Sequence, residues 1–128
     1  MSNTSEIRSE FIEKAEAIIL KNISNEQFGV SELAEVMNMS RSNLLRKIKK
    51  DTELSASQFI RQVRLVKSME LLKLNSMTVS EISYQVGFGS TSYFIKCFRE
   101  FYGYPPGEAG KRKIEDGPVK KQSGLFSK

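Results

Sequence analysis

Apolar residues recur at three- and four-residue spacing along most of this chain, which is the period of an amphipathic helix. The first such segment covers residues 7–22 and carries acids early and Lys21 late, in agreement with the helix dipole. The longest covers residues 55–74 and opens with a capping box, in which Ser55 is followed three residues later by Gln58. The pattern predicts an all-α fold.

A shorter pattern occurs twice. The first copy, residues 30–48, is VSELAEVMNMSRSNLLRKI, and the second, residues 79–98, is VSEISYQVGFGSTSYFIKCF, which has one extra residue at its central turn. Each copy predicts a short helix, a tight turn and a second helix. We call the second helix the reading helix and expect it over residues 41–50 in the first copy and 91–102 in the second.

The residues at the turns support this assignment. Asn38 and Gly87 stand where such a turn needs a left-handed backbone, which asparagine tolerates and glycine adopts without steric cost. Ala34 and Ser83 occupy matching positions, and both are small, as required where the two helices cross closely. Each reading helix follows a serine, which is a strong N-cap, and Gly103 ends the second one.

A helix, a turn and a second helix with an exposed polar face form the unit that most often enters the major groove of DNA. Two copies therefore predict two groove segments bound by one chain. The intervening helix of residues 55–74 is about 30 Å long. This length is close to the roughly 34 Å turn of B-DNA and suits two reading helices about one turn apart.

Packing is expected to bury Leu44 and Ile48 of the first reading helix, which leaves Ser42, Leu45 and Arg46 on one exposed stripe. Arg46 is the first candidate for a base contact, because its planar fork matches the two major-groove acceptors of guanine. The alternative is a surface arginine in a local ion pair. Leu45 either touches a thymine methyl group or belongs to the core.

The second reading helix offers Thr91, Ser92 and Lys96 as candidates for base contacts. Lysine is a less directional ligand than arginine, so we expect the first reading helix to set sequence preference and the second mainly to fix register. Candidates for phosphate contacts lie at helix N-termini and among the cations, and they are Ser31, Arg41, Ser55, Arg61, Thr78 and Arg99.

Several side chains of the second reading helix have a plainer interpretation. Cys97 is expected to be a small apolar residue on a packed helix face. Helical spacing favours core packing over base stacking for most of the aromatic residues, which are Tyr93, Phe94, Phe98, Phe101 and Tyr102.

The chain has 128 residues with one cysteine and no histidine. A disulfide framework, the usual zinc ligand sets and a histidine general base are therefore excluded. Gly110 and Lys111 do not form a phosphate loop, because Pro105 and Arg112 replace the glycine and the hydroxyl residue of that motif. No apolar run approaches the roughly 20 residues of a membrane span. We expect a cytoplasmic protein with no enzyme activity, no metal, no cofactor and no membrane contact by this segment.

The net charge of +5 is unevenly distributed. Residues 1–40 carry three cations and seven acids, whereas residues 41–67 carry eight cations and two acids. A positive field centred on the first reading helix suits a polyanionic partner. The alternative is an ordinary solvated face. Residues 111–128, with six cations and two acids, predict a disordered basic tail, and residues 1–6 predict a flexible N-terminus.

The extended second copy, VSEISYQVGFGSTSYFIKCFREFYGYPP, resembles the DNA-binding domain of the AraC/XylS family of bacterial transcription regulators, as do MSRSNLLRKIK and SASQFIRQVRL. The resemblance implies one domain of about seven helices over residues 7–110. Two helix-turn-helix units, at residues 30–50 and 78–102, would be joined by a linker helix at 55–74. It also implies binding of double-stranded operator DNA by a monomer, with both reading helices in successive major-groove segments.

Carried over by position, the base-contacting residues of the family fall on Ser42, Leu45, Arg46, Thr91, Ser92 and Lys96. RNA polymerase is implied as a further partner. The chain departs from the family near its last helix, where Gly107 and Gly110 replace a polar cap and a basic residue.

The segments FIEKAEAIILKN and GVSELAEVMNMSRSNLLRKIK also resemble the C-terminal output domain of hybrid two-component sensors that regulate polysaccharide use. This resemblance implies that the chain is a fragment, controlled by phosphorylation-driven dimerisation of a portion absent here. Outside these resemblances, the alternative function is a helical module that binds protein without reading DNA.

Overall fold

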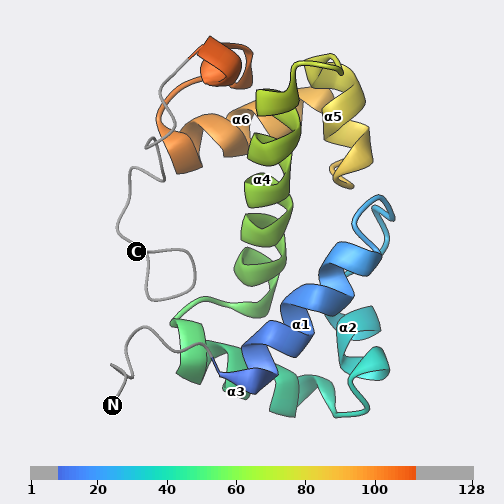
Figure 1. Ribbon diagram of the computed structural model, residues 1–128. Coiled ribbons are helices and arrows are strands. Elements are labelled where there is room, and N and C mark those ends of the chain that lie inside the picture. The colour runs from blue at the N-terminus through green and yellow to red at the C-terminus, as the bar shows by residue number, and fades with distance from the viewer. Residues whose placement is uncertain (1–8, 112–128) are drawn as a thin grey trace. The chain divides into compact units, whose positions relative to one another are not determined.

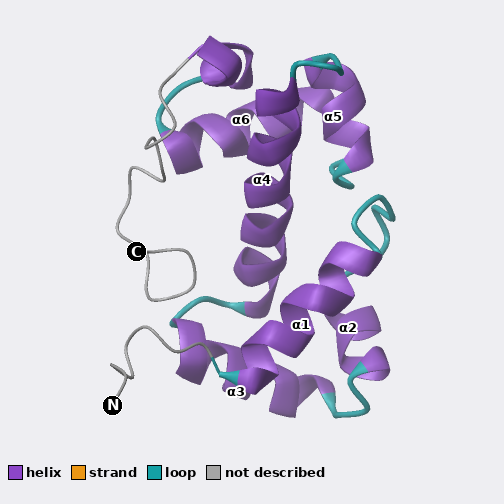
Figure 2. Ribbon diagram, viewed as in Figure 1, coloured by secondary structure: helices purple, strands orange, loops and turns teal. Residues whose placement is uncertain are grey.

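The computed structural model describes residues 9–111, and within that range all regular structure is helical (Figures 1 and 2). In chain order the elements are α1 (Glu10–Lys21), α2 (Val30–Val36), α3 (Arg41–Thr52), α4 (Ala56–Leu74), α5 (Val79–Gln85), α6 (Thr91–Tyr102) and the 3₁₀-helix η2 (Pro106–Lys111). The all-α prediction is confirmed. The predicted flexible N-terminus and, apart from its first residue, the predicted basic tail lie outside the described residues.

Three elements differ in detail from the prediction. Helix α1 begins at Glu10 rather than at residue 7, because Ser9 caps it and accepts a hydrogen bond from Ile12 N at 3.0 Å. Helix α3 extends two residues further than expected, to Thr52, whose hydroxyl donates to Ile48 O at 2.7 Å. The final segment forms a 3₁₀-helix, because its glycines weaken an α-helix.

The chain forms two compact units. Among the described residues, the first unit contains 9–22 and 28–63, and the second contains 23–27 and 64–111. Helices α1, α2, α3 and the start of α4 build the first unit; the rest of α4, together with α5, α6 and η2, builds the second.

The core of the first unit is mainly aliphatic. Its most buried side chains include Ile12, Ala15, Ile19, Leu33, Leu44, Ile48 and Phe59. Phe11, one of the regularly spaced apolar residues of α1, is only half-buried. Its ring lies 4.9 Å from Lys47 Nζ, a cation–π contact, and Ile12 is buried beside it.

The core of the second unit is aromatic. The Phe94 ring centroid lies 5.2 Å from that of Phe88 and 5.8 Å from that of Phe98, and Phe98 lies 4.6 Å from Tyr102. These tilted and edge-on arrangements are the favourable ones for aromatic pairs. Core packing is thus confirmed for most of these aromatics, and Cys97 is buried as well. Tyr93 is the exception, because 45% of its surface is exposed.

The two helix-turn-helix turns begin with the same backbone geometry, and the longer second turn adds another left-handed residue, Gly89, with φ of 71°. Asn38 and Gly87 adopt left-handed conformations, with φ of 60° and 84°. After each of them the chain returns a hydrogen bond to the small residue of the first helix: Met39 N donates to Ala34 O at 3.1 Å, and Phe88 N donates to Ser83 O at 2.9 Å. This pattern closes a helix C-terminus and satisfies its last carbonyls.

A buried arginine fills the space beside the second turn. Arg64 Nη1 donates to Ile23 O at 2.6 Å and to Val86 O at 2.8 Å, and Nη2 donates to Asn25 O at 3.2 Å. Burial lowers the pKa of the Arg64 guanidinium, an effect that the nearby Glu26 carboxylate opposes. Three carbonyl acceptors compensate for the loss of water around this charge.

Gly87 cannot accept a side chain at this site. A Cβ atom there would lie 1.8 Å from Arg64 Nη1 and 2.4 Å from Ile23 O, in a left-handed backbone that L-residues rarely adopt. We expect Gly87→Ala to lower the free energy of unfolding by about 2–4 kcal/mol, measured by chemical denaturation.

Gly107→Ala is the matched control, because no atom lies within 4 Å of its added Cβ. This change should leave stability unaltered or raise it by up to about 1 kcal/mol. Equal effects of the two substitutions would contradict the role assigned to Gly87.

Candidate nucleic-acid interface

The reading helices, α3 and α6, begin with the same cap. Ser40 Oγ accepts from Asn43 N at 3.1 Å, and Ser90 Oγ accepts from Tyr93 N at 3.2 Å. Each cap satisfies one of the free N–H groups of the first turn. The start of each reading helix is therefore fixed by its own sequence, as the serines predicted.

The two helices also end alike, which the sequence pattern did not reveal. Glu53 closes α3 and Gly103 closes α6, both in left-handed conformations with φ of 67° and 92°. The two N–H groups donate to Lys49 O and Arg99 O, both at 2.8 Å. The structural repeat thus continues past residues 48 and 98. The sequence does not show this, because Glu53 stands where the second copy has Gly103.

Burial of one side of each reading helix determines which side remains exposed. Leu44 and Ile48 in α3 are completely buried, and so are Phe94 and Phe98 at the matching positions of α6. The opposite face of each helix carries four matching residues. In α3 they are Ser42, Leu45, Arg46 and Lys49, and in α6 they are Ser92, Ile95, Lys96 and Arg99.

This exposed face, which we call the outer stripe, has the same order of residue types in both units: serine, a branched aliphatic residue and two cations. Every member is exposed except Ile95, which is half-buried. Leu45 is 38% exposed and so belongs to the surface rather than to the core. The candidates chosen from the sequence did not include Lys49, and Arg99 was considered only for phosphate.

Thr91 has a second task besides the predicted base contact. It is half-buried, and its Oγ1 lies 3.2 Å from both Ser80 Oγ and Ser83 Oγ. These contacts join the start of α6 to α5. At the matching position of α3, Arg41 Nη1 donates to Ser31 Oγ at 3.4 Å.

Arg46 is held by a neutral neighbour. One of its terminal nitrogens, Nη2, donates to Asn43 Oδ1 one turn earlier on α3. The local partner is therefore an amide rather than the acid considered from the sequence. The sequence alone did not identify Asn43 as a positioning residue, although its i, i+3 spacing from Arg46 places the two side chains within reach of each other.

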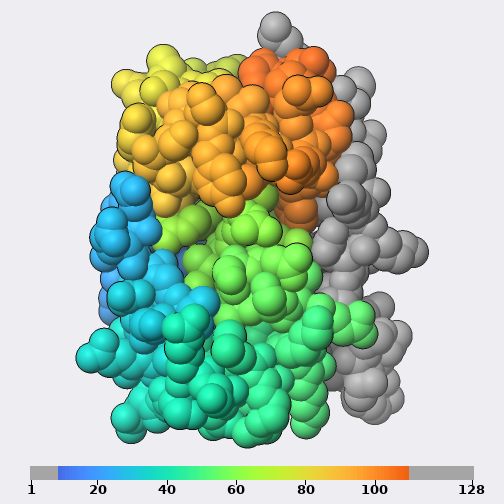
Figure 3. Space-filling model, turned by 180° about the vertical axis from the view of Figure 1, so that it is seen from behind, coloured from blue at the N-terminus to red at the C-terminus, as the bar shows by residue number. Residues whose placement is uncertain are grey.

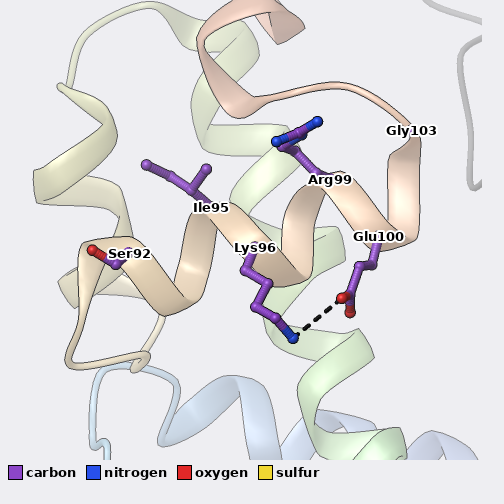
Figure 4. Close-up of a pocket in the computed structure, with 6 residues that line it drawn as sticks. All are labelled: Ser92, Ile95, Lys96, Arg99, Glu100 and Gly103. Atoms are coloured by element: carbon purple, nitrogen blue, oxygen red, sulfur yellow. Dashed lines mark ion pairs between the residues drawn. The ribbon is translucent and has the colours of Figure 1, made fainter.

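Lys96 is held by an acid. Its Nζ lies 3.2 Å from Glu100 Oε2, one turn later on α6, and both side chains are well exposed (Figure 4). Figure 4 shows Lys96 and Glu100 projecting from one edge of α6, and Ile95 and Arg99 from the other. With Ser92 and Gly103 these residues line a shallow hollow.

The phosphate candidates divide between the units. Ser31, Arg41, Ser55 and Arg61 belong to the first unit, and Thr78 and Arg99 belong to the second. All are exposed except Arg61, which is half-buried. Two of the hydroxyls also cap helices: Ser55 Oγ accepts from Gln58 N at 3.1 Å, and Thr78 Oγ1 accepts from Glu81 N at 3.0 Å.

Carboxylates already occupy the N-termini of the two short helices. Glu32 Oε1 accepts from Gly29 N at 2.9 Å, and Glu81 Oε1 accepts from Thr78 N at 2.9 Å. The hydrogen bond from Gly29 lowers the pKa of Glu32, so its carboxylate is charged. Phosphate near Ser31 or Thr78 would therefore meet a negative charge at the same helix end.

These features, a capped helix pair with a left-handed turn and an exposed cationic stripe, occur once in each unit and define a double helix-turn-helix protein. A family model described as a helix-turn-helix domain matches residues 33–112. The chain belongs to this family. Its fold is that of an AraC-type regulator from Chromobacterium violaceum, with a TM-score of 0.73 and 24% identity, covering 83% of this chain and 94% of that one.

Three similar proteins illustrate the family. Histidine kinase P4 of Formosa agariphila is 38% identical over 111 residues, covering 87% of this chain but 8% of that protein. The crystal structure of the C-terminal domain of the two-component response regulator yesN from Fusobacterium nucleatum has a TM-score of 0.70 and 29% identity, covering 80% of this chain and 99% of that one. The DNA-binding domain of AdpA, a global transcriptional factor crystallised with a target DNA, has a TM-score of 0.71 and 25% identity, covering 80% and 92%.

The chain is much shorter than its curated relatives. It spans 8% of the length of P4 and 22–36% of the length of several other regulators that it matches. Among the described residues, no helix is both long and apolar enough to cross a membrane.

The hydroxyl of Thr91 should stabilise the second unit. We expect Thr91→Val, which keeps the branched shape and removes the hydroxyl, to lower the free energy of unfolding by about 1 kcal/mol. The neighbouring Ser92→Ala should change it by less than about 0.5 kcal/mol, because Ser92 is exposed. Chemical denaturation measures both, and equal losses would show that the contacts with Ser80 and Ser83 contribute nothing.

Proposed function

We propose that this chain is a sequence-specific, double-stranded DNA-binding domain of a bacterial transcription regulator. The observation that carries the proposal is the outer stripe, which appears in the same order on two separately capped helices over fully buried inner faces. Small polar, apolar and cationic side chains on one helix face match the donors, acceptors and methyl groups of the major groove. The complex of the AdpA domain with DNA supports the same function.

In this proposal α3 and α6 enter successive major-groove segments. Base contacts come from Ser42, Leu45 and Arg46 of α3 and from Thr91, Ser92 and Lys96 of α6. The hydrogen bond to Asn43 positions the Arg46 guanidinium before DNA binds. Arg46 then binds a guanine through guanidinium N–H groups that do not contact Asn43. Phosphate contacts come from Arg41, Ser55, Arg61 and Arg99, and we add Lys49, which extends the outer stripe of α3. Ser31 and Thr78 are weaker candidates for phosphate contacts, because the Glu32 and Glu81 carboxylates lie at the same helix ends.

The kinds of protein that contain a similar domain suggest a context for the whole regulator. A histidine kinase and a two-component response regulator both contain a similar domain, so we propose that this chain is the output part of a two-component regulator. Dimerisation then belongs to a portion outside this chain, and RNA polymerase is the further partner. We place the protein in the cytoplasm and assign no enzymatic step to this segment.

The second candidate is a helical module that binds another protein through the same surfaces. Exposed apolar residues on α5 and α6, Tyr84 at 55% and Tyr93 at 45% exposure, favour it. The two functions differ in their dependence on salt, because binding of DNA releases counterions from the phosphates.

Binding to a nonspecific duplex should weaken steeply as salt rises. With six or more phosphate contacts, the affinity should fall by roughly 10³-fold or more between about 50 and 200 mM salt, measured by fluorescence anisotropy of a labelled duplex. Absence of binding at about 50 mM salt would reject the proposed function in favour of the protein-binding module.

Arg46 and Lys96 should have different effects on sequence preference. After selection of bound sites from random DNA, Arg46→Ala should cost about 1–3 kcal/mol on the selected operator and relax the preference at one position. Lys96→Ala should also weaken binding to the selected operator, but with a smaller change in the base preference at any one position, because a lysine is a less directional ligand than an arginine. Lys14→Ala on α1 serves as a control for loss of one positive charge. Equal, sequence-independent losses at Arg46 and Lys96 would show that the roles are wrongly assigned.

A further inference from the structure

The two reading helices carry opposite charges at one pair of matching positions. Residue 50 of α3 is a lysine, and the corresponding residue 100 of α6 is a glutamate; no other pair between residues 41–52 and 91–102 reverses its charge. The outer stripes themselves match in type. The acid is thus the main electrostatic difference between the two helices on their exposed side.

Glu100 lies next to the outer stripe and engages one of its cations. Its Oε2 is 3.2 Å from Lys96 Nζ, with 68% of the Lys96 side chain and 61% of the Glu100 side chain exposed. The pair follows i, i+4 spacing on α6 and is accessible to a ligand (Figure 4). Residues of α6, orange in Figure 3, form part of the surface of the second unit on the side seen there.

An exposed ion pair of this kind contributes little to the stability of the fold. Its larger effect concerns binding. Nonspecific affinity for DNA comes almost entirely from cations that replace counterions along the phosphates. A lysine that a carboxylate already neutralises adds little to this nonspecific affinity. The carboxylate also repels any phosphate that approaches the same edge of the helix.

A base contact changes the balance. An acceptor at the edge of a correct base pair offers Lys96 a directional hydrogen bond in the groove, which competes with Glu100 better than a diffuse array of phosphates does. At such a site Lys96 can leave the Glu100 carboxylate for the base acceptor. Arbitrary DNA offers no acceptor in that position, so the ion pair with Glu100 persists.

We propose that Glu100 is a specificity-determining residue of α6, which lowers affinity for arbitrary DNA by holding Lys96 and repelling phosphate, and releases Lys96 to a base acceptor at the operator. This inference rests on the proposed DNA-binding function. In this proposal Glu100 acts through Lys96 rather than by a base contact of its own. It raises specificity by disfavouring binding to arbitrary DNA.

The test uses Glu100→Gln, which removes the charge and keeps the shape. Its affinity for a nonspecific duplex should rise about 3- to 10-fold, and its salt dependence should steepen by about one counterion. Affinity for the operator selected with the unmodified protein should change less than about twofold, so the ratio of operator to nonspecific affinity falls. Glu100→Lys, which copies residue 50, should give a larger gain on nonspecific DNA.

Glu70→Gln is the matched control. Glu70 Oε1 lies 3.3 Å from Lys67 Nζ on α4, so the second unit contains another Lys–Glu pair, with an exposed glutamate and a half-buried lysine. The substitution removes the same charge away from the reading helix and should leave both affinities nearly unchanged. Circular dichroism melts check that all variants are folded.

Three outcomes would overturn the inference. If Glu100→Gln behaves like Glu70→Gln, the position of the charge is irrelevant. If operator and nonspecific affinities rise equally, Glu100 does not affect specificity. If operator affinity falls, the carboxylate itself accepts from a base, such as cytosine N4. Each of these requires the unmodified protein to bind DNA; its failure to bind at about 50 mM salt would instead reject the proposed function and this inference together.

Discussion

One backbone constraint, a left-handed residue just after the first helix of each helix-turn-helix pair, determines the rest of each unit. Asn38 and Gly87 end the first helix of each pair, and the following N–H returns to the carbonyl of a small buried residue. This geometry brings the second helix close enough to bury its apolar side. In the second unit the turn also leaves room for the Arg64 guanidinium, which binds three carbonyls. Packing of the apolar side therefore determines which face of each reading helix is exposed.

The two units present the same outer stripe in different surroundings. Arg46 is held by the neutral Asn43, whereas Lys96 is held by Glu100. An amide keeps the full positive charge of its partner available to a polyanion, but a carboxylate cancels it. In the proposed complex with DNA, the two helices therefore differ less in their stripe residues than in the partners of those residues within the same helix.

Several features of the candidate site could be predicted from residue types and spacing. The serine caps, the capping boxes and the left-handed turns are all present where the sequence predicts them. Other expectations needed correction. Arg64 contributes to the positive charge counted along the chain, but it is 6% exposed and adds little to the surface. Thr91, chosen for the groove, also directs its hydroxyl toward Ser80 and Ser83.

The sequence by itself determined the helices, their caps, the duplicated unit and the faces that pack. Each of these depends on dihedral preferences and hydrogen bonds within a few consecutive residues, which residue types at fixed spacing specify. Only the tertiary structure decided that Arg64 is buried and that the loop residues Ile23 and Asn25 supply its acceptors. These outcomes depend on which distant backbone groups come within reach of a side chain, and periodicity along one helix contains no such information.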